Sequence, residues 1–209
     1  MREAAEAGDI GEMTTPTREI ELKFLLDAAG AAAVLAALPP GETVMKDMVA
    51  TYFDTDDHWL RRNGFGLRVR RTGVERIQTL KSTLGEDGGR DEWEWPVETD
   101  APDLALLATT PAALPAGAAL LALFTVSSRR TLRMVQTDGA LIELVIDDAR
   151  VEAGGRVDAF LELELELKDG DPAALSTLAA RLSAVADLTP TALTKAGRGY
   201  RLLGDPDQT

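Results

Sequence analysis

Acidic and basic side chains recur at alternate positions in several segments of this 209-residue sequence. Glu19, Glu21 and Lys23 share one parity, and Arg68 and Arg70 form a second run of the same kind. Residues at i and i+2 of a β-strand lie on one face, roughly 7 Å apart, so like charges there repel. A surface selected only for solubility would mix both signs within each strand. The separation of acidic from basic strands therefore indicates faces that bind a ligand.

The charged faces fall into two groups of segments. Carboxylates dominate the segments 17–25, 140–148 and 157–168. Cations dominate the segments 65–72, 74–82 and 124–136. Carboxylate oxygens suit Mg²⁺ or Mn²⁺. Arginine binds phosphate oxygens through two parallel N–H donors, and lysine binds them as a point charge. A barrel with one acidic wall and one basic wall would hold a divalent cation beside a chain of phosphates.

The same alternation also fits ordinary half-buried strands. In that interpretation Glu162, Glu164 and Glu166 are solvated, and the leucines between them pack on a core. The recurrence of the charged faces across the chain favours the binding interpretation, in which the leucines point outward beneath helices. Trp93 and Trp95 have the parity opposite to their neighbouring glutamates, so we expect them to pack outside as well.

Hydrophobic periodicity and turn residues outline the elements that position these side chains. Eight segments alternate with a period of two: 17–25, 44–53, 65–72, 74–82, 91–98, 124–136, 140–148 and 157–168. Helices are predicted over 28–38, within 101–122 and over 172–186, the last beginning at Asp171-Pro172. Eight long, mostly antiparallel strands suit a closed β-barrel with flanking helices, an α+β fold.

Composition limits the classes of function. The 22 Lys and Arg against 35 Asp and Glu give a net charge of −13, which argues against a general nucleic-acid or membrane-surface binder. The sequence has no cysteine and a single histidine, His58, so thiolate chemistry is excluded and histidine-based sites are disfavoured. Without a signal peptide or apolar span, a cytoplasmic location is expected. We expect a single domain over 16–204 between short tails at 1–15 and 205–209.

Several motifs occur in the order found in one known family. Glu19-x-Glu21-x-Lys23 resembles the ExExK signature of the CYTH, or triphosphate tunnel metalloenzyme, superfamily. Further matching stretches are Tyr52-Phe53-Asp54-Thr55, Gly66-Leu67-Arg68-Val69-Arg70, Leu80-Lys81, Arg90-x-Glu92-x-Glu94, Phe160–Glu164 and Thr194–Tyr200. The resemblance covers residues 17–203 and is closest to bacterial inorganic triphosphatases, here expected without the helical CHAD domain that many of them carry.

The resemblance also implies roles for individual residues. Metal ligands are expected at Glu19, Glu21, Glu162, Glu164 and Asp147, with Asp148 as the alternative one position along. The catalytic set comprises Glu19, Glu21, Lys23, Glu162 and Glu164. Phosphate contacts are expected from Lys23, Arg68, Arg70, Lys81 and Lys195, and parity favours Arg129 and Arg133 over Arg130, which shares its parity with Leu132 and Met134. Further candidates are Glu92, Glu94, Glu143, Glu166 and Arg198.

This resemblance implies metal-dependent chemistry on a triphosphate, with one or two Mg²⁺ or Mn²⁺ ions. Hydrolysis of inorganic triphosphate is the leading expectation. Thiamine-triphosphatase, nucleoside triphosphatase, class IV adenylyl cyclase and a non-catalytic polyphosphate-binding module remain alternatives. The expected partner is the small-molecule triphosphate alone, without nucleic acid or membrane, and the chain is expected to be a monomer or a homodimer.

Overall fold

The computed structural model describes residues 14–86 and 88–204. The strands are β1 (Thr17–Leu26), β2 (Val44–Asp54), β3 (Phe65–Thr72), β4 (Glu75–Ser82), β5 (Gly89–Pro96), β6 (Leu121–Thr137), β7 (Ala140–Ala153), β8 (Arg156–Asp169) and the two-residue β9 (Thr189–Pro190). The helices are α1 (Ala28–Ala37), α2 (Trp59–Arg62), α3 (Leu104–Leu107), α4 (Ala173–Leu182) and α5 (Lys195–Leu203). All eight predicted strands are present, whereas α2 and α5 were not predicted.

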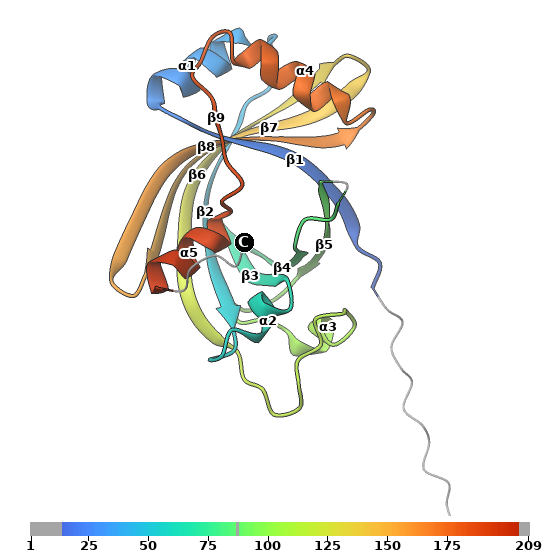
Figure 1. The fold of residues 1–209 in the computed structure, drawn as a ribbon, viewed down its shortest axis with the longest axis vertical. Coiled ribbons are helices and arrows are strands. Elements are labelled where there is room, and N and C mark those ends of the chain that lie inside the picture. Colours follow the sequence, from blue (N-terminus) through green and yellow to red (C-terminus); the bar gives the residue numbers. More distant parts are fainter. Residues whose placement is uncertain (1–13, 87, 205–209) are drawn as a thin grey trace, which may run out of the picture.

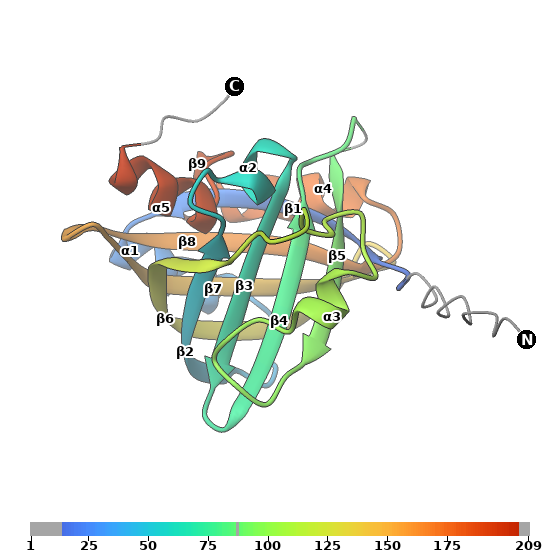
Figure 2. The ribbon, with the colours of Figure 1, turned by 90° about the horizontal axis from the view of Figure 1, so that it is seen from below.

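Eight antiparallel strands close into a barrel, as predicted from the alternation. The sheet order is β5-β4-β3-β2-β6-β7-β8-β1, and β5 pairs back with β1 to close it (Figures 1 and 2). Residues 17–20 of β1 pair with β5, and residues 21–26 pair with β8. The first strand is therefore the seam of the barrel, and β9 extends its pairing at Phe24 and Leu25.

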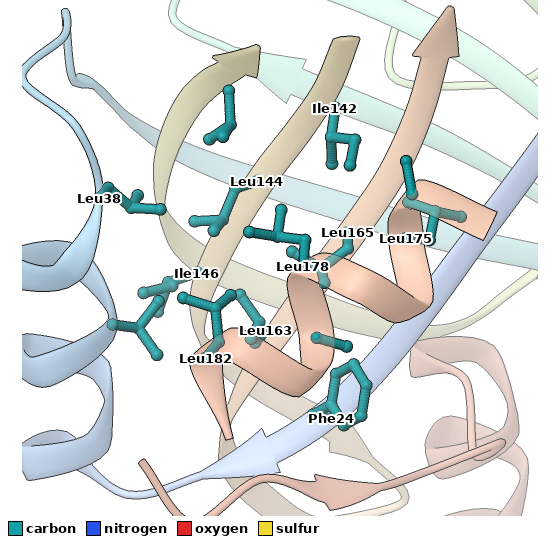
Figure 3. Packing of buried hydrophobic residues seen from close by; sticks show 14 of the residues in the cluster. Phe24, Leu38, Ile142, Leu144, Ile146, Leu163, Leu165, Leu175, Leu178 and Leu182 are labelled. Carbon is teal, nitrogen blue, oxygen red and sulfur yellow. The ribbon is translucent and has the colours of Figure 1, made fainter. Parts of the chain in front are cut away.

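The largest apolar cluster lies outside the barrel. Helices α1 and α4 cover the outer face of β1, β7 and β8, where Leu144, Leu163 and Leu165 are fully buried (Figures 1 and 3). Helix α1 begins at Asp27, whose carboxylate accepts a hydrogen bond from the Gly30 amide at 2.7 Å. The outward leucines thus pack beneath helices, as the sequence predicted.

Two smaller clusters complete the packing. The first covers the outer face of β3, β4 and β5, where Trp93 is buried beside Leu107 of α3. The only helix within the segment 101–122 is the four-residue α3, because prolines at 102, 111 and 115 interrupt helix formation, and the segment ends in the first residues of β6. In the second cluster, Tyr52 and Phe124 stack with ring centroids 4.8 Å apart, and Tyr200 of α5 packs against Phe124.

The predicted tails lie mostly outside the described residues, which omit 1–13 and 205–209. Thr14 is described, and its carbonyl accepts a hydrogen bond from the Trp93 indole at 2.9 Å. Its hydroxyl also bonds to that of Thr109 at 2.7 Å. Within residues 14–86 and 88–204, no helix is long and apolar enough to span a membrane.

Candidate active site

The inner face of the barrel surrounds a cavity of about 770 Å³ lined by charged side chains. Inward and outward residues alternate along each strand because successive side chains point to opposite faces. The charged lining residues include Glu19, Glu21, Lys23, Lys46, Arg68, Arg70, Glu75, Lys81, Arg90, Glu92, Glu94, Arg130, Glu143, Glu164, Glu166, Lys168 and Lys195. The charged faces therefore converge on one cavity.

Glu19 of β1 is held by two cations from neighbouring strands. The Lys81 ammonium lies 2.7 Å from Glu19 Oε1, and Arg90 Nε donates to Glu19 Oε2 at 2.6 Å. Burial alone would raise the pKa of Glu19, but the positive charges and hydrogen bonds of Lys81 and Arg90 lower it to about 2. Glu19 is therefore ionised at neutral pH.

The chain of ion pairs continues across the seam to β8. Arg90 also contacts Glu21, and Lys23 lies 2.9 Å from Glu21 Oε2 while contacting Glu164. Burial opposes the charge on Lys23, yet the carboxylates of Glu164 and Glu21 raise its pKa overall. Each charge on β1 is thereby neutralised by a neighbour, which offsets the cost of removing it from water.

Three carboxylates form a compact cluster where β7 meets β8. One oxygen each of Asp147, Glu162 and Glu164 lies within 4.8 Å of the other two, and Asp147 and Glu162 are fully buried. Arg130 of β6 binds Asp147 through two hydrogen bonds of 2.9 and 2.7 Å. Of the two alternatives, Asp147 is the buried residue within this cluster, whereas Asp148 is exposed.

Lys195, the first residue of α5, places its ammonium among these three carboxylates. Its Nζ lies 3.0 Å from Asp147 and 2.9 Å from Glu164, and it also contacts Glu162. Burial disfavours the charge of Lys195, but Glu164 and Asp147 raise its pKa overall. In contrast, burial and the charge of Glu164 raise the pKa of Glu162. Glu162 Oε2 is buried and has no hydrogen-bond partner among the described residues.

The opposite wall carries Arg68 and Arg70 on β3. Arg70 has only a 3.4 Å contact with Glu94, and the Nε of Arg68 is buried without a hydrogen-bond partner among the residues described. Tyr52 lies across the strand pair from Arg68. Burial raises the pKa of the Tyr52 phenol, but the charge and hydrogen bonding of Arg68 lower it overall. This wall therefore retains donor capacity for an anionic ligand.

Helix α5 is anchored independently of Lys195. The Thr194 hydroxyl caps the helix by accepting from the Gly197 amide at 3.0 Å, and the Tyr200 hydroxyl donates to Asp54 at 2.7 Å. A Cβ atom at Gly199 would lie 2.2 Å from the Phe124 ring. A glycine is thus required for this close approach between α5 and β6.

Two predicted phosphate contacts are wrong. Arg129 is exposed and pairs with Asp47 on the outer face at 3.1 Å. Arg133 donates to the carbonyls of Leu35 and Gly41 near the end of α1. Arg130 is the inward arginine of β6. The choice of Arg129 and Arg133 assumed that the apolar Leu132 faces outward. Leu132 lines the cavity, so the inner face of this strand is partly apolar.

The further candidate residues also divide into those that line the cavity and those that lie outside it. Glu92, Glu94, Glu143 and Glu166 line the cavity. Arg198 does not, because it pairs with Asp158 at 2.7 Å and stacks over Phe160 outside the cavity. Arg90 was missed as a site residue, although it shares its parity with Glu92. Its partner Glu19 lies 71 positions away and becomes visible only when the barrel closes.

Comparison with known proteins agrees with this architecture. The inorganic triphosphatase of Haemophilus influenzae is 31% identical over 157 residues, covering 73% of this chain but 45% of that protein. The chain thus spans about half the length of that relative. Among solved structures, a Hippeastrum protein assigned as an adenylyl cyclase with a dominant triphosphatase activity superimposes with a TM-score of 0.59 at 16% identity, covering 91% of this chain and 97% of its own.

The PH1819 protein of Pyrococcus horikoshii has a TM-score of 0.55 at 17% identity, covering 82% of this chain and 92% of its own. At these identities the structural likenesses establish the fold alone. The model of the CYTH domain matches residues 17–200, which include the barrel and the cationic first turn of α5. On this match and this fold, the chain belongs to the CYTH family.

Proposed function

We propose that this chain hydrolyses the terminal phosphate of inorganic triphosphate within the barrel, with Mg²⁺ or Mn²⁺ as the cofactor. One observation carries the proposal: cations able to bind phosphates line the same cavity as Glu19, Glu21 and Glu164, whose carboxylates are able to hold a metal. The similarity to an inorganic triphosphatase supports it. A non-catalytic anion binder would gain nothing from the buried carboxylates, whose desolvation is costly.

The phosphate chain would lie against the cations that retain donor capacity. Arg68 and Arg70 offer guanidinium groups from β3, and the buried Nε of Arg68 has a hydrogen to donate. Lys23, Lys81 and Arg130 are paired with carboxylates and would share their charge with phosphate oxygens. Phosphoryl transfer depends mainly on positioning and charge neutralisation, which these side chains supply.

The carboxylate cluster fits a divalent cation. Asp147, Glu162 and Glu164 present hard oxygen donors close together, and Glu162 Oε2 is buried without a partner among the described residues. These three residues would hold the ion, with Glu19 and Glu21 as further proposed ligands. When bound, the ion would reduce the charge of the triphosphate and acidify a water molecule. Lys23 and Arg130, which contact Glu164, would keep that carboxylate in position.

Organic triphosphates form a second candidate substrate class. The cavity volume of about 770 Å³ lies within the range of roughly 300–1,000 Å³ that accommodates drug-sized ligands. The cavity therefore has room for a thiamine or nucleoside group in addition to three phosphates. Cyclisation of ATP would also require a site for the base and ribose, and the sequence shows no nucleotide-recognition motif.

Phosphate release from triphosphate, thiamine triphosphate and ATP, each with Mg²⁺ or Mn²⁺, tests the proposal. We expect inorganic triphosphate to be the preferred substrate and Glu21→Gln to lower its kcat/KM by about 10²-fold or more. Glu152→Gln is the matched control, because Glu152 is exposed on β7 and pairs with Arg150 outside the cavity. Absence of hydrolysis, or equal activity of both variants, would refute the assignment of this site.

A further inference from the structure

The ammonium of Lys195 lies among the three carboxylates of the cluster. Its Nζ contacts all three of Asp147, Glu162 and Glu164, the same residues whose oxygens lie within 4.8 Å of one another. A divalent ion entering this cluster would meet a unit positive charge at hydrogen-bond distance from its own ligands. At such short distances the two cations repel each other, even with partial screening.

We propose that the Lys195 ammonium competes with the divalent ion for these three carboxylates. Triphosphate draws Lys195 away from the carboxylates, so that metal and triphosphate bind cooperatively. This inference rests on the proposed function of the cavity. The negative phosphate chain offers Lys195 an alternative partner, and the vacated carboxylates then accept the metal. Because binding linkage is reciprocal, the metal must also strengthen triphosphate binding by the same factor.

The unpaired oxygen of Glu162 supports this exchange. Lys195 contacts Glu162 Oε1, whereas Oε2 is buried and has no hydrogen-bond partner among the described residues. A lysine ammonium is a compact point charge with three donors, and here it donates hydrogen bonds to Glu162 and Glu164 and forms an ion pair with Asp147. The ammonium therefore neutralises the cluster only in part, and an ion of higher charge would use the remaining oxygen.

The placement of Lys195 allows its side chain to move while the helix stays in place. Helix α5 is anchored by Tyr200 to Asp54 and by Arg198 to Asp158, neither of which involves Lys195. A cation in the first turn opposes the helix dipole, so helix stability does not account for a lysine here. Arg130, by contrast, is fixed to Asp147 by two hydrogen bonds. Lys195 is therefore the group suited to exchange.

Binding of Mn²⁺ alone, measured from the electron paramagnetic resonance signal of the free ion, tests the competition without any turnover. Lys195→Gln removes the competing charge, and we expect it to bind Mn²⁺ at least about tenfold more tightly than wild type. Lys168→Gln is the matched control. Lys168 lines the same cavity but pairs with Glu143 and Glu166, so its loss changes the overall charge equally without vacating the cluster.

A gain confined to Lys195→Gln supports the inference. Equal or weaker Mn²⁺ binding by that variant, or an equal gain in Lys168→Gln, overturns it. These outcomes are separate from the proposed function, because a protein that hydrolyses no triphosphate could still show the gain, and an active one could lack it.

A crystal structure of the wild-type protein provides a measurement that does not depend on the folding of a variant. The crystals would contain Mn²⁺ and a triphosphate with imido bridges, which resists hydrolysis. Departure of Lys195 Nζ from Glu162 and Glu164 supports the exchange. Retention of a hydrogen bond to either carboxylate overturns it.

Discussion

The outer and inner faces of β1 and β8 are built from alternating residues of the same strands, yet different interactions stabilise the two faces. On the outside, Phe24, Leu163 and Leu165 pack beneath α1 and α4. On the inside, Lys23 and Glu164 form part of a chain of buried ion pairs. Burying a large apolar side chain stabilises the fold by about 1.5–3 kcal/mol, whereas a buried ion pair roughly offsets its own desolvation.

The two faces of one sheet thus differ in what holds their side chains in place. Burial of apolar side chains stabilises the outer face, whereas the inner face depends on the pairing of its charges. Its charges are retained in ion pairs between neighbouring strands. Each of the following predictions tests whether the two faces are independent in this way.

The largest difference is expected between two adjacent arginines. Arg130→Gln removes both hydrogen bonds to the fully buried Asp147, so we expect a loss of about 3–5 kcal/mol of unfolding free energy and about 10² in kcat/KM for triphosphate. Arg129→Gln makes the same chemical change on the outer face and should cost less than about 1 kcal/mol. Urea unfolding and steady-state hydrolysis measure both effects. Similar losses in the two variants would show that the faces are not distinct.

The outer face should respond in stability alone. Leu165→Ala empties part of the cluster beneath α4 and should lower the unfolding free energy by about 2–5 kcal/mol. The hydrolytic rate per folded molecule should change little, because Leu165 points away from the cavity. Val74→Ala, at a side chain that is 90% exposed, serves as the control with almost no effect on urea unfolding. A loss below 1 kcal/mol for Leu165→Ala would contradict this account of the outer face.

The smallest predicted effect concerns acid unfolding. Despite burial, Lys81 and Arg90 lower the folded-state pKa of Glu19 from its ordinary value of 4.5 to about 2, so its contribution to stability is complete above pH 4.5 and is lost as the pH falls towards 2. By linkage, this contribution reaches up to about 3 kcal/mol. The pKa of Glu162 is raised, so this residue acts in the opposite direction.

Urea unfolding between pH 5 and 2 measures this contribution. We expect the stability of Glu19→Gln to fall less steeply with decreasing pH than that of the wild type. Glu152→Gln, on the outer face, should follow the wild-type slope. Parallel slopes for Glu19→Gln and wild type would exclude a depressed pKa at Glu19.

Strand parity predicted most of the fold and many of the inward residues. The alternation along 157–168 separated the leucines beneath α4 from the cavity-facing Glu164, and the same reasoning placed Asp147 inward. Parity is informative because a strand has only two faces, and a slip of one residue would bury the charges against the helices.

Parity alone could not show which strands meet across the seam or where a tertiary contact stabilises a short helix. The pairing of Arg90 with Glu19 depends on barrel closure between segments far apart in the sequence. Helix α5 has nine residues and includes two glycines, so its isolated helix propensity is low. It forms because Tyr200 is tied to Asp54 and because Gly199 allows close approach to Phe124.

The position of β1 at the seam has a consequence for biosynthesis. The first strand leaves the ribosome long before its partners, since Lys23 and Glu164 lie 141 positions apart. Until β8 is synthesised, the charges of β1 remain hydrated and the nascent chain has no enclosed site. Contacts of such long sequence separation form slowly. We therefore expect the cavity to form late in folding, when the first strand joins β8 and α5 brings Lys195 into the barrel.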